Sequence, residues 1–201
     1  WDYIFSMIKS LNTKIEFPDR NTLTMTQPFL EAYVEQIVNT CHQRGIHAMG
    51  GMSAFIPTKD QQENNNIIIN ILKDKELEIK RGCDGAWVAH PGLISPIKNL
   101  FQEKLGADNQ IDTYIASGTV ENSRLRQLES EKQFTKTELK NNISVTLQYI
   151  AAWLHGNGAV AINNLMEDLA TAEISAAQLK NWKNFNTSLS GNKKENFDDI
   201  F

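Results

Sequence analysis

The chain has 201 residues and a net charge of −4, from 20 Lys plus Arg against 24 Asp plus Glu. Hydrophobic residues make up 41% of it, an ordinary share for a globular protein with a core, and the length suits one medium domain or a piece of a larger one. No block of like charge occurs, which argues against nucleic acid because phosphate binding requires a concentrated basic face. No apolar run is long enough for a membrane span.

The first half of the chain alternates strand-like and helix-like segments. Short apolar runs predict strands at residues 1–8, 46–52 and 86–89. Apolar residues at helical spacing predict helices over residues 28–44, 60–81 and 96–105. Pro28 suits a first helical turn and Gly45 suits a left-handed helix end. This order predicts βαβ units and a parallel sheet, with strands that could be consecutive staves of a barrel.

The remainder of the chain reads differently. Residues 106–134 are polar and without a clear period, so we predict a linker or loop there. Thr135 followed by Glu138 is a capping box that opens a helix, which Gly156 and Gly158 end. We predict a further helix over about 160–172 and another that starts at a second capping box, Ser175 with Gln178.

Several segments could carry chemistry, although each also has a structural explanation. The glycine turn Met49–Met52 and the turn His90–Gly92 follow predicted strands, where active residues of α/β folds gather, but both could be tight turns only. Asp2 in an apolar run suits a magnesium ligand or a surface-facing strand residue. Glu167 and Asp168 point in different directions on a helix, so one could be a desolvated base, or both could be solvated.

Other kinds of site lack support. The two cysteines, Cys41 and Cys83, lie far apart and read as reduced thiols of a cytosolic protein. No HxH or HExxH spacing indicates zinc, and no GxSxG, P-loop or GxGxxG occurs. The chain opens inside an apolar run and closes without an obvious stop, so a fragment of a longer protein is expected.

Four segments together resemble the malate synthases of the A type, those of bacteria and glyoxysomes: WDYIFSMIKS, FPDRNTLTMTQPFLEAYVEQIVNTCHQRGIHAMGGMSAFIPTKD, GAWVAHPG and GNGAVAINNLMEDLATAEIS. The resemblance covers nearly the whole chain except about 106–134 and the last few residues. It implies an α/β fold in which residues 1–105 form the last strands of a TIM barrel. Residues 106–134 would then be a linker, and residues 135–201 would begin a helical C-terminal domain.

The resemblance also implies a reaction and its residues. The family condenses acetyl-CoA with glyoxylate in a magnesium-dependent Claisen reaction of the glyoxylate bypass, and hydrolysis then yields malate and CoA. Asp168 matches the catalytic base and Asp2 the aspartate that binds Mg2+. Met52, Trp87 and Pro91 match positions that line the acetyl-CoA and glyoxylate pocket. The family's enolate-stabilising arginine and its glutamate metal ligand are expected upstream of Trp1, so this chain alone is expected to be inactive.

Two other functions stay open beside a magnesium-dependent malate synthase. The chain could be an inactive remnant with only a binding or scaffold role, which a native mass would reveal. Another acyl-CoA lyase on a related barrel is less consistent with the MED-type helix. The expected partners are small molecules, without nucleic acid or membrane. The expected compartment is the cytoplasm, or the glyoxysome or peroxisome in a eukaryote.

Overall fold

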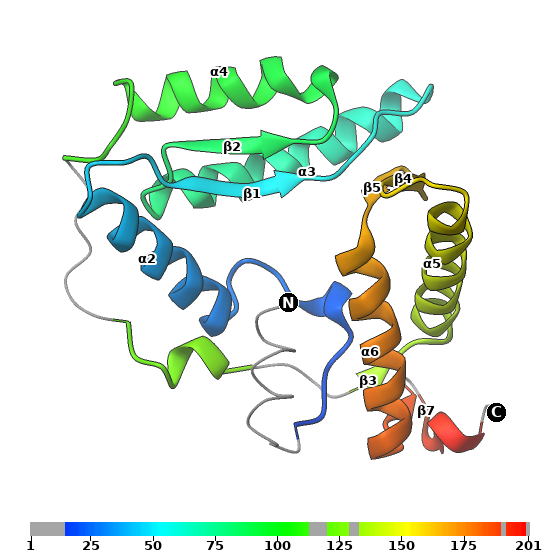
Figure 1. Ribbon diagram of the computed structural model, residues 1–201. Helices are drawn as coiled ribbons and strands as arrows, with labels where there is room; N and C mark the ends of the chain where they lie inside the picture. Colours follow the sequence, from blue (N-terminus) through cyan, green and yellow to red (C-terminus); the bar gives the residue numbers. More distant parts are fainter. Residues whose placement is uncertain (1–14, 113–119, 129–132, 190–191, 200–201) are drawn as a thin grey trace. The chain divides into compact units, whose positions relative to one another are not determined.

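The computed structural model describes residues 15–112, 120–128, 133–189 and 192–199 (Figure 1). The chain divides into two compact units. Unit 1 contains the described parts of residues 1–24 and 129–201, and unit 2 contains those of residues 25–128. The predicted strand over residues 1–8, with Asp2, lies outside the described residues. Within the described segments, no helix combines the length and apolarity that crossing a bilayer requires.

Unit 2 follows the predicted order of strands and helices. Its elements are α2 (Pro28–His42), β1 (Met49–Ser53), α3 (Gln61–Lys80), β2 (Gly85–Val88), η2 (Pro91–Leu93), α4 (Ile94–Leu105) and η3 (Arg124–Arg126). The strands β1 and β2 pair in parallel, with α3 as the crossover between them. The prediction of a parallel βαβ unit is therefore confirmed. The glycines expected in a loop after the strand lie within β1 itself.

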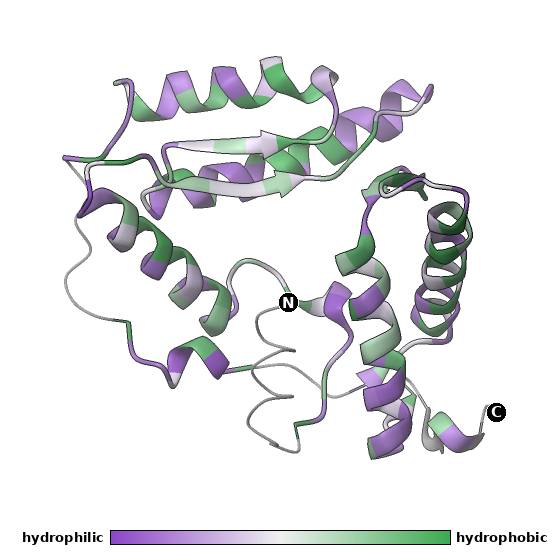
Figure 2. Ribbon diagram, in the orientation of Figure 1, coloured by the Kyte–Doolittle hydropathy of each residue, from purple (hydrophilic) through white to green (hydrophobic). Residues whose placement is uncertain are grey.

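The main core of unit 2 lies between the strands and two helices. Figure 2 shows hydrophobic and hydrophilic residues alternating along α4, as the amphipathic pattern requires. Residues of α3, α4, η2 and the segment after β1 form the cluster, namely Phe55, Ile79, Leu93, Ile97 and Phe101. Ala86 and Val88 of β2 pack against it, so one face of β2 is covered by helices.

Unit 1 is built around two long helices, α5 (Lys136–Leu154) and α6 (Leu169–Phe185). Its remaining elements are η1 (Arg20–Thr22), β3 (Gln133–Phe134), β4 (Val160–Ile162), β5 (Leu165–Glu167), β6 (Ser188–Leu189), β7 (Asn192–Asn196) and η4 (Phe197–Asp199). The fully buried Trp182 of α6 stacks on Phe134, with ring centroids 4.9 Å apart. The Thr135 side chain accepts the Glu138 backbone N–H at 3.0 Å, so the predicted start of α5 is confirmed.

The segment that precedes η1 is attached to α6 by hydrogen bonds from three side chains. Trp182 Nε1 donates to the Phe17 carbonyl at 3.0 Å, and Gln178 Nε2 donates to the Pro18 carbonyl at 2.7 Å. Asn181 accepts the Phe17 backbone N–H at 2.8 Å. These side chains satisfy backbone groups of a segment without regular structure and so hold it in place.

Two predictions for the C-terminal part are wrong. Residues 160–167 form an antiparallel hairpin of β4 and β5 rather than a helix. Its two-residue turn, Asn163 and Asn164, has φ of 51° and 61°, which asparagine tolerates and which a tight hairpin turn requires. Ser175 does not cap a helix, because it lies buried inside α6, and Asp168 caps that helix instead.

Because the carboxyl group of Asp19 is buried, we expect the stability of unit 1 to depend on pH. Burial raises the pKa of this carboxyl from 3.8 to about 6, with Glu138 adding to the rise and the Asn21 N–H opposing it. The folded unit favours the protonated carboxyl of Asp19. The contribution of this group to the free energy of unfolding is therefore complete below pH 3.8 and is lost as pH rises through about 6. At about 1.4 kcal/mol per pKa unit, it amounts to about 3 kcal/mol.

We therefore expect Asp19→Asn to gain stability relative to the wild type between pH 4 and pH 8, by up to about 3 kcal/mol. The asparagine oxygen can still accept the Asn21 N–H, which Asp19 accepts at 2.9 Å. Urea unfolding at several pH values measures this difference. The exposed Asp198→Asn serves as the control and should show no such trend. A constant difference between Asp19→Asn and the wild type across this range would contradict the prediction.

Candidate active site

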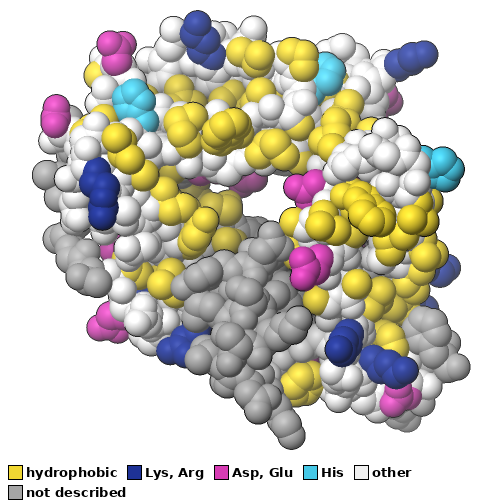
Figure 3. Space-filling view, viewed as in Figure 1, with side chains coloured by type: hydrophobic (Ala, Val, Ile, Leu, Met, Phe, Trp, Pro, Cys, Tyr) yellow, Lys and Arg dark blue, Asp and Glu magenta, His cyan; other side chains and the backbone are white. Residues whose placement is uncertain are grey.

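The β1–β2 sheet of unit 2 has one face that its helices do not cover. Met52 and Trp87 are directly paired across the two strands, and their exposed fractions are 52% and 61%. Met49, 43% exposed, lies on the same face, because its Sδ and Cε would be within 3 Å of a Cβ on its partner Gly85. Figure 3 shows hydrophobic side chains gathered over this sheet. Three large apolar side chains thus form what we call the Met–Trp face.

The position of Trp87 follows from the alternation of side chains along a strand. Its neighbours Ala86 and Val88 pack into the helix-covered core, so Trp87 points to the opposite side. Exposed apolar side chains that gather in one patch are one mark of a binding site. Met52 and Trp87, two of the three predicted pocket residues, are therefore brought together.

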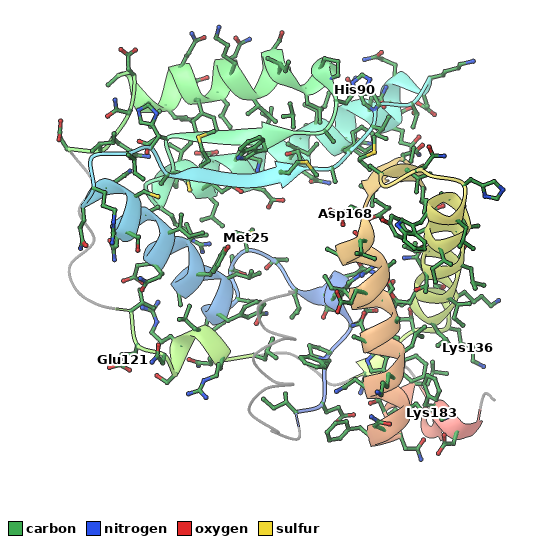
Figure 4. All side chains as sticks on the ribbon, in the orientation of Figure 1. Met25, His90, Glu121, Lys136, Asp168 and Lys183 are labelled. Carbon is green, nitrogen blue, oxygen red and sulfur yellow. The ribbon has the colours of Figure 1, made fainter. Side chains whose placement is uncertain are left out.

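Pro91, the third predicted pocket residue, lies just beyond the carboxyl end of β2. It is exposed and opens η2, while Leu93 of the same turn is 1% exposed and anchors it in the core. His90, labelled in Figure 4, accepts the Gly92 N–H on Nδ1 at 3.0 Å. The His90–Gly92 turn is thus a helix start fixed by its own side chains, and Pro91 is presented at the strand end.

The glycine pair of β1 forms a β-bulge. Met49 pairs with Gly85, and Met52 pairs with Trp87. Between these two pairs β1 advances by three residues and β2 by two, so β1 contains one extra residue. A Cβ on Gly50 would overlap the Glu78 carboxylate, whereas one on Gly51 would lie 3.6 Å from Glu78 Oε1. The sequence does not reveal the contact of Glu78 with the two glycines, because Lys75 and Glu78 look like an ordinary charged pair on an amphipathic helix.

Asp84 connects the starts of both strands to the rest of unit 2. Its Oδ2 accepts the Ala48 N–H at 2.7 Å and lies 2.8 Å from His42 Nε2. Its Oδ1 accepts the Gln110 N–H at 2.7 Å. Burial raises the pKa of this carboxyl, but these hydrogen bonds outweigh burial and hold it below its usual range. Asp84 therefore holds the starts of both strands with two carboxylate oxygens that are already hydrogen-bonded.

Asp168, the predicted base, belongs to unit 1 and caps α6 at its amino end (Figure 4). It is exposed, and its Oδ1 accepts the Thr171 N–H at 3.2 Å. Among the described residues Oδ2 has no hydrogen-bond partner, so this oxygen can accept a proton. The expectation that one of the two adjacent acids faces inward is met by Glu167, 7% exposed, and not by Asp168.

The residues behind Asp168 form a buried charged cluster in unit 1. Burial lowers the pKa of the Arg20 guanidinium, while Glu138, Glu167 and Asp19 raise it through their negative charge. Glu167 ends β5 and precedes Asp168 directly, and its negative charge is one of those that raise the pKa of Arg20. The hairpin and the cap together fix the backbone on which Asp168 stands.

The structure does not test the metal site. Asp2 lies outside the described residues. Across residues 15–112, 120–128, 133–189 and 192–199, no group of three or more His, Cys, Asp or Glu side chains could hold a metal ion. The described residues therefore contain no complete metal site of their own, and Asp2 stays a prediction.

Comparison with known proteins agrees with a barrel segment followed by a separate C-terminal domain. Residues 1–127 match the family model for the malate synthase TIM barrel domain, and residues 133–200 match that for the malate synthase C-terminal domain. The class is therefore an α/β barrel piece joined to this C-terminal domain. The chain belongs to the malate synthase family.

Several relatives carry malate synthase names. The chain is 44% identical over 197 residues to malate synthase of Myxococcus xanthus, covering 96% of this chain and 36% of the relative. It is 42% identical over 196 residues to malate synthase A of Escherichia coli, covering 96% and 37%. The glyoxysomal malate synthase of Gossypium hirsutum is 42% identical over 198 residues, covering 95% and 35%. The chain thus spans about a third of the length of these relatives.

The two glycines of β1 provide a matched pair of substitutions. We expect Gly50→Ala to lower the free energy of unfolding by about 1–3 kcal/mol, because the methyl group overlaps the buried Glu78 carboxylate. Gly51→Ala should change it by less than about 1 kcal/mol, since its Cβ has ordinary contact distance. Chemical denaturation measures both. Equal effects of the two substitutions would show that Glu78 does not lie against Gly50.

Proposed function

We propose that the protein is a malate synthase, which condenses acetyl-CoA with glyoxylate and hydrolyses the product to malate and CoA. Membership of the family carries the proposal, and the exposed carboxylate of Asp168 agrees with it. Names among the relatives support a role in the glyoxylate bypass, since one from Caenorhabditis elegans is called a bifunctional glyoxylate cycle protein. The compartment would be the cytoplasm, or the glyoxysome of a eukaryote, as the glyoxysomal relatives suggest.

In the proposed reaction Asp168 is the general base. Its free Oδ2 takes a proton from the methyl group of acetyl-CoA, and the electron pair left behind forms the enolate of the thioester. The enolate carbon then bonds to the aldehyde carbon of glyoxylate, and the C=O π bond breaks. The aldehyde oxygen gains a proton, which balances the one that Asp168 took and then gives up, and becomes the hydroxyl group of malate. Water cleaves the resulting thioester and releases CoA.

The Met–Trp face would bind the acetyl-CoA co-substrate. Met52 and Trp87 present a thioether and an indole ring side by side, and both adapt well to apolar and aromatic ligand groups. Pro91 would add to this surface at the carboxyl end of β2, where α/β barrels bind their ligands. No charged side chain is needed from these positions, because the acetyl and pantetheine groups are uncharged.

Magnesium is proposed as the cofactor on the basis of the resemblance alone. When bound, Mg2+ would polarise the glyoxylate aldehyde and so make it a better electrophile. Asp2 would supply one carboxylate oxygen, the kind of ligand that Mg2+ prefers.

The alternative is a catalytically inactive remnant with a binding or scaffold role. The native mass of the protein and an assay of thiol release, with and without glyoxylate, separate the two. A mass well above that of 201 residues together with glyoxylate-dependent turnover supports the enzyme. A native mass equal to that of this chain, without turnover, supports the remnant.

In the complete natural protein, Asp168→Asn should reduce kcat by about 10²–10⁴-fold, since an amide cannot accept the methyl proton. Binding of both substrates should persist, because Asn can still cap α6. Thiol release measures turnover, and titration calorimetry measures binding. Glu173→Gln removes another exposed carboxylate of α6 and is the control. Turnover of Asp168→Asn near that of the wild type would remove Asp168 from the role of base.

A second substitution tests the metal ligand. Asp2→Ala in the complete natural protein should raise the Mg2+ concentration that half-maximal activity requires by at least about tenfold. Loss of even an outer-shell partner of a metal ligand costs about 10–100-fold in metal affinity, and Asp2 is predicted to bind the ion directly. The measurement is a Mg2+ titration of activity at saturating substrates. The Asp60→Asn variant, altered at an exposed helix cap, is the control. A titration curve identical to the wild type would exclude Asp2 from the metal site.

A further inference from the structure

The bulge in β1 decides which side chain lies beside Trp87. Starting from the pair Met49 with Gly85, a regular ladder would place Gly51 opposite Trp87 and Met52 opposite Val88. Val88 packs into the helix-covered core, so Met52 would then turn towards α3 and α4. The one extra residue of the bulge reverses this and brings Met52 to the exposed face, opposite Trp87.

A buried ion pair of α3 binds the backbone at the bulge. Lys75 and Glu78 are 4% and 3% exposed, and Lys75 Nζ lies 2.9 and 3.0 Å from the two carboxylate oxygens. Lys75 Nζ also donates to the Gly51 carbonyl, and the Gly51 N–H donates to Glu78 Oε1 at 3.2 Å. Both backbone groups of Gly51 therefore have a hydrogen-bond partner in the same buried ion pair.

Placing this ion pair at a core position costs free energy. Burying two charges removes their hydration, and well-packed apolar residues often stabilise a fold equally well. Burial raises the pKa of the Glu78 carboxyl, although the Lys75 ammonium opposes the rise. By contrast, the exposed pair of Glu76 and Lys80 on the same helix makes no contact with β1 in the hydrogen bonds and ion pairs described for these residues. The buried pair is thus suited to select a backbone register, because it forms hydrogen bonds to the Gly51 backbone, which apolar side chains cannot form.

We propose that Lys75 and Glu78 are positioning residues that fix the register of β1 and thereby hold Met52 beside Trp87 for acetyl-CoA. The identity of the ligand rests on the proposed function, whereas the register does not. Neither side chain needs to touch the substrate, because both act through the Gly51 backbone. Loss of the pair would remove Met52 from the Met–Trp face and leave Asp168 unchanged.

The test compares the reactivity of two methionines in the complete natural protein. Hydrogen peroxide oxidises exposed methionines, and peptide mass spectrometry gives separate rates for Met49 and Met52. In Glu78→Gln the Met52 rate should fall at least about threefold relative to Met49, because Met52 turns towards the core while Met49 precedes the bulge. The control Glu76→Gln, which alters the exposed pair of α3, should leave the ratio unchanged.

Steady-state kinetics provide the second measurement. Glu78→Gln should raise the KM for acetyl-CoA at least about threefold, with kcat and the KM for glyoxylate within about twofold of the wild type, as expected for lost ground-state binding. An unchanged Met52 to Met49 ratio, or a fall in kcat alone, overturns the proposal. If wild-type turnover is absent, the proposed function fails, and the oxidation ratio still decides the register.

A second variant covers the case in which Glu78→Gln does not fold. Glu78→Asp keeps the negative charge beside Lys75 but withdraws the carboxylate from the Gly51 N–H by one methylene group. We expect the same fall in the Met52 to Met49 oxidation ratio. A ratio equal to that of the wild type in this folded variant overturns the proposal.

Discussion

The contact between the Lys75–Glu78 pair and Gly51 is the interaction on which the exposed side of unit 2 depends. The β1–β2 sheet has a covered face, formed by Ala86 and Val88 against the helices, and an open face that carries Trp87. Side chains alternate along a strand, so a shift of one residue would exchange the two faces. The buried pair stabilises the extra residue of β1, and the apolar side chains Met52 and Trp87 become neighbours as a result.

Unit 1 places its candidate base by different means. Asp168 stands between a β-hairpin and α6, and it caps the helix with one carboxylate oxygen while the other remains available. Glu167, the residue before it, is buried, so the end of β5 lies in the interior of unit 1. An adjacent pair of acids is thus divided into one buried carboxylate and one exposed carboxylate, and the exposed one is the base in the proposed function.

Family membership and geometry support the proposed function in separate ways. The two family models match both parts of the chain. Because the chain spans about a third of the malate synthases of Myxococcus xanthus and Escherichia coli, the activity of the whole protein is a proposal. The geometry contributes the Met–Trp face and the free oxygen of Asp168. In the proposed reaction, binding of acetyl-CoA uses an apolar surface, and formation of its enolate uses a proton acceptor. The Met–Trp face of unit 2 is assigned to the first and Asp168 of unit 1 to the second.

Much of the local structure was determined by the sequence itself, because its signals act over a few residues. Pro28 at the start of α2, Thr135 as the cap of α5 and the parallel βαβ order were all predicted from neighbouring residues, and the structure confirms them. The hairpin of β4 and β5 was missed although Asn163–Asn164 carried its turn signal, since the flanking apolar residues also suit a helix. Resemblance to a family, rather than spacing, selected Asp168, Met52, Trp87 and Pro91.

Which of these residues meet, and how each is held, depends on how the helices and strands pack together. Lys75 and Glu78 look like an ordinary helical ion pair, and Gly50–Gly51 looks like a loop, until the crossover from β1 through α3 brings them together. Asp84 likewise receives His42, Ala48 and Gln110 from three different segments. Such contacts join residues 24 to 42 positions apart, and no local pattern records them because they depend on how the elements pack.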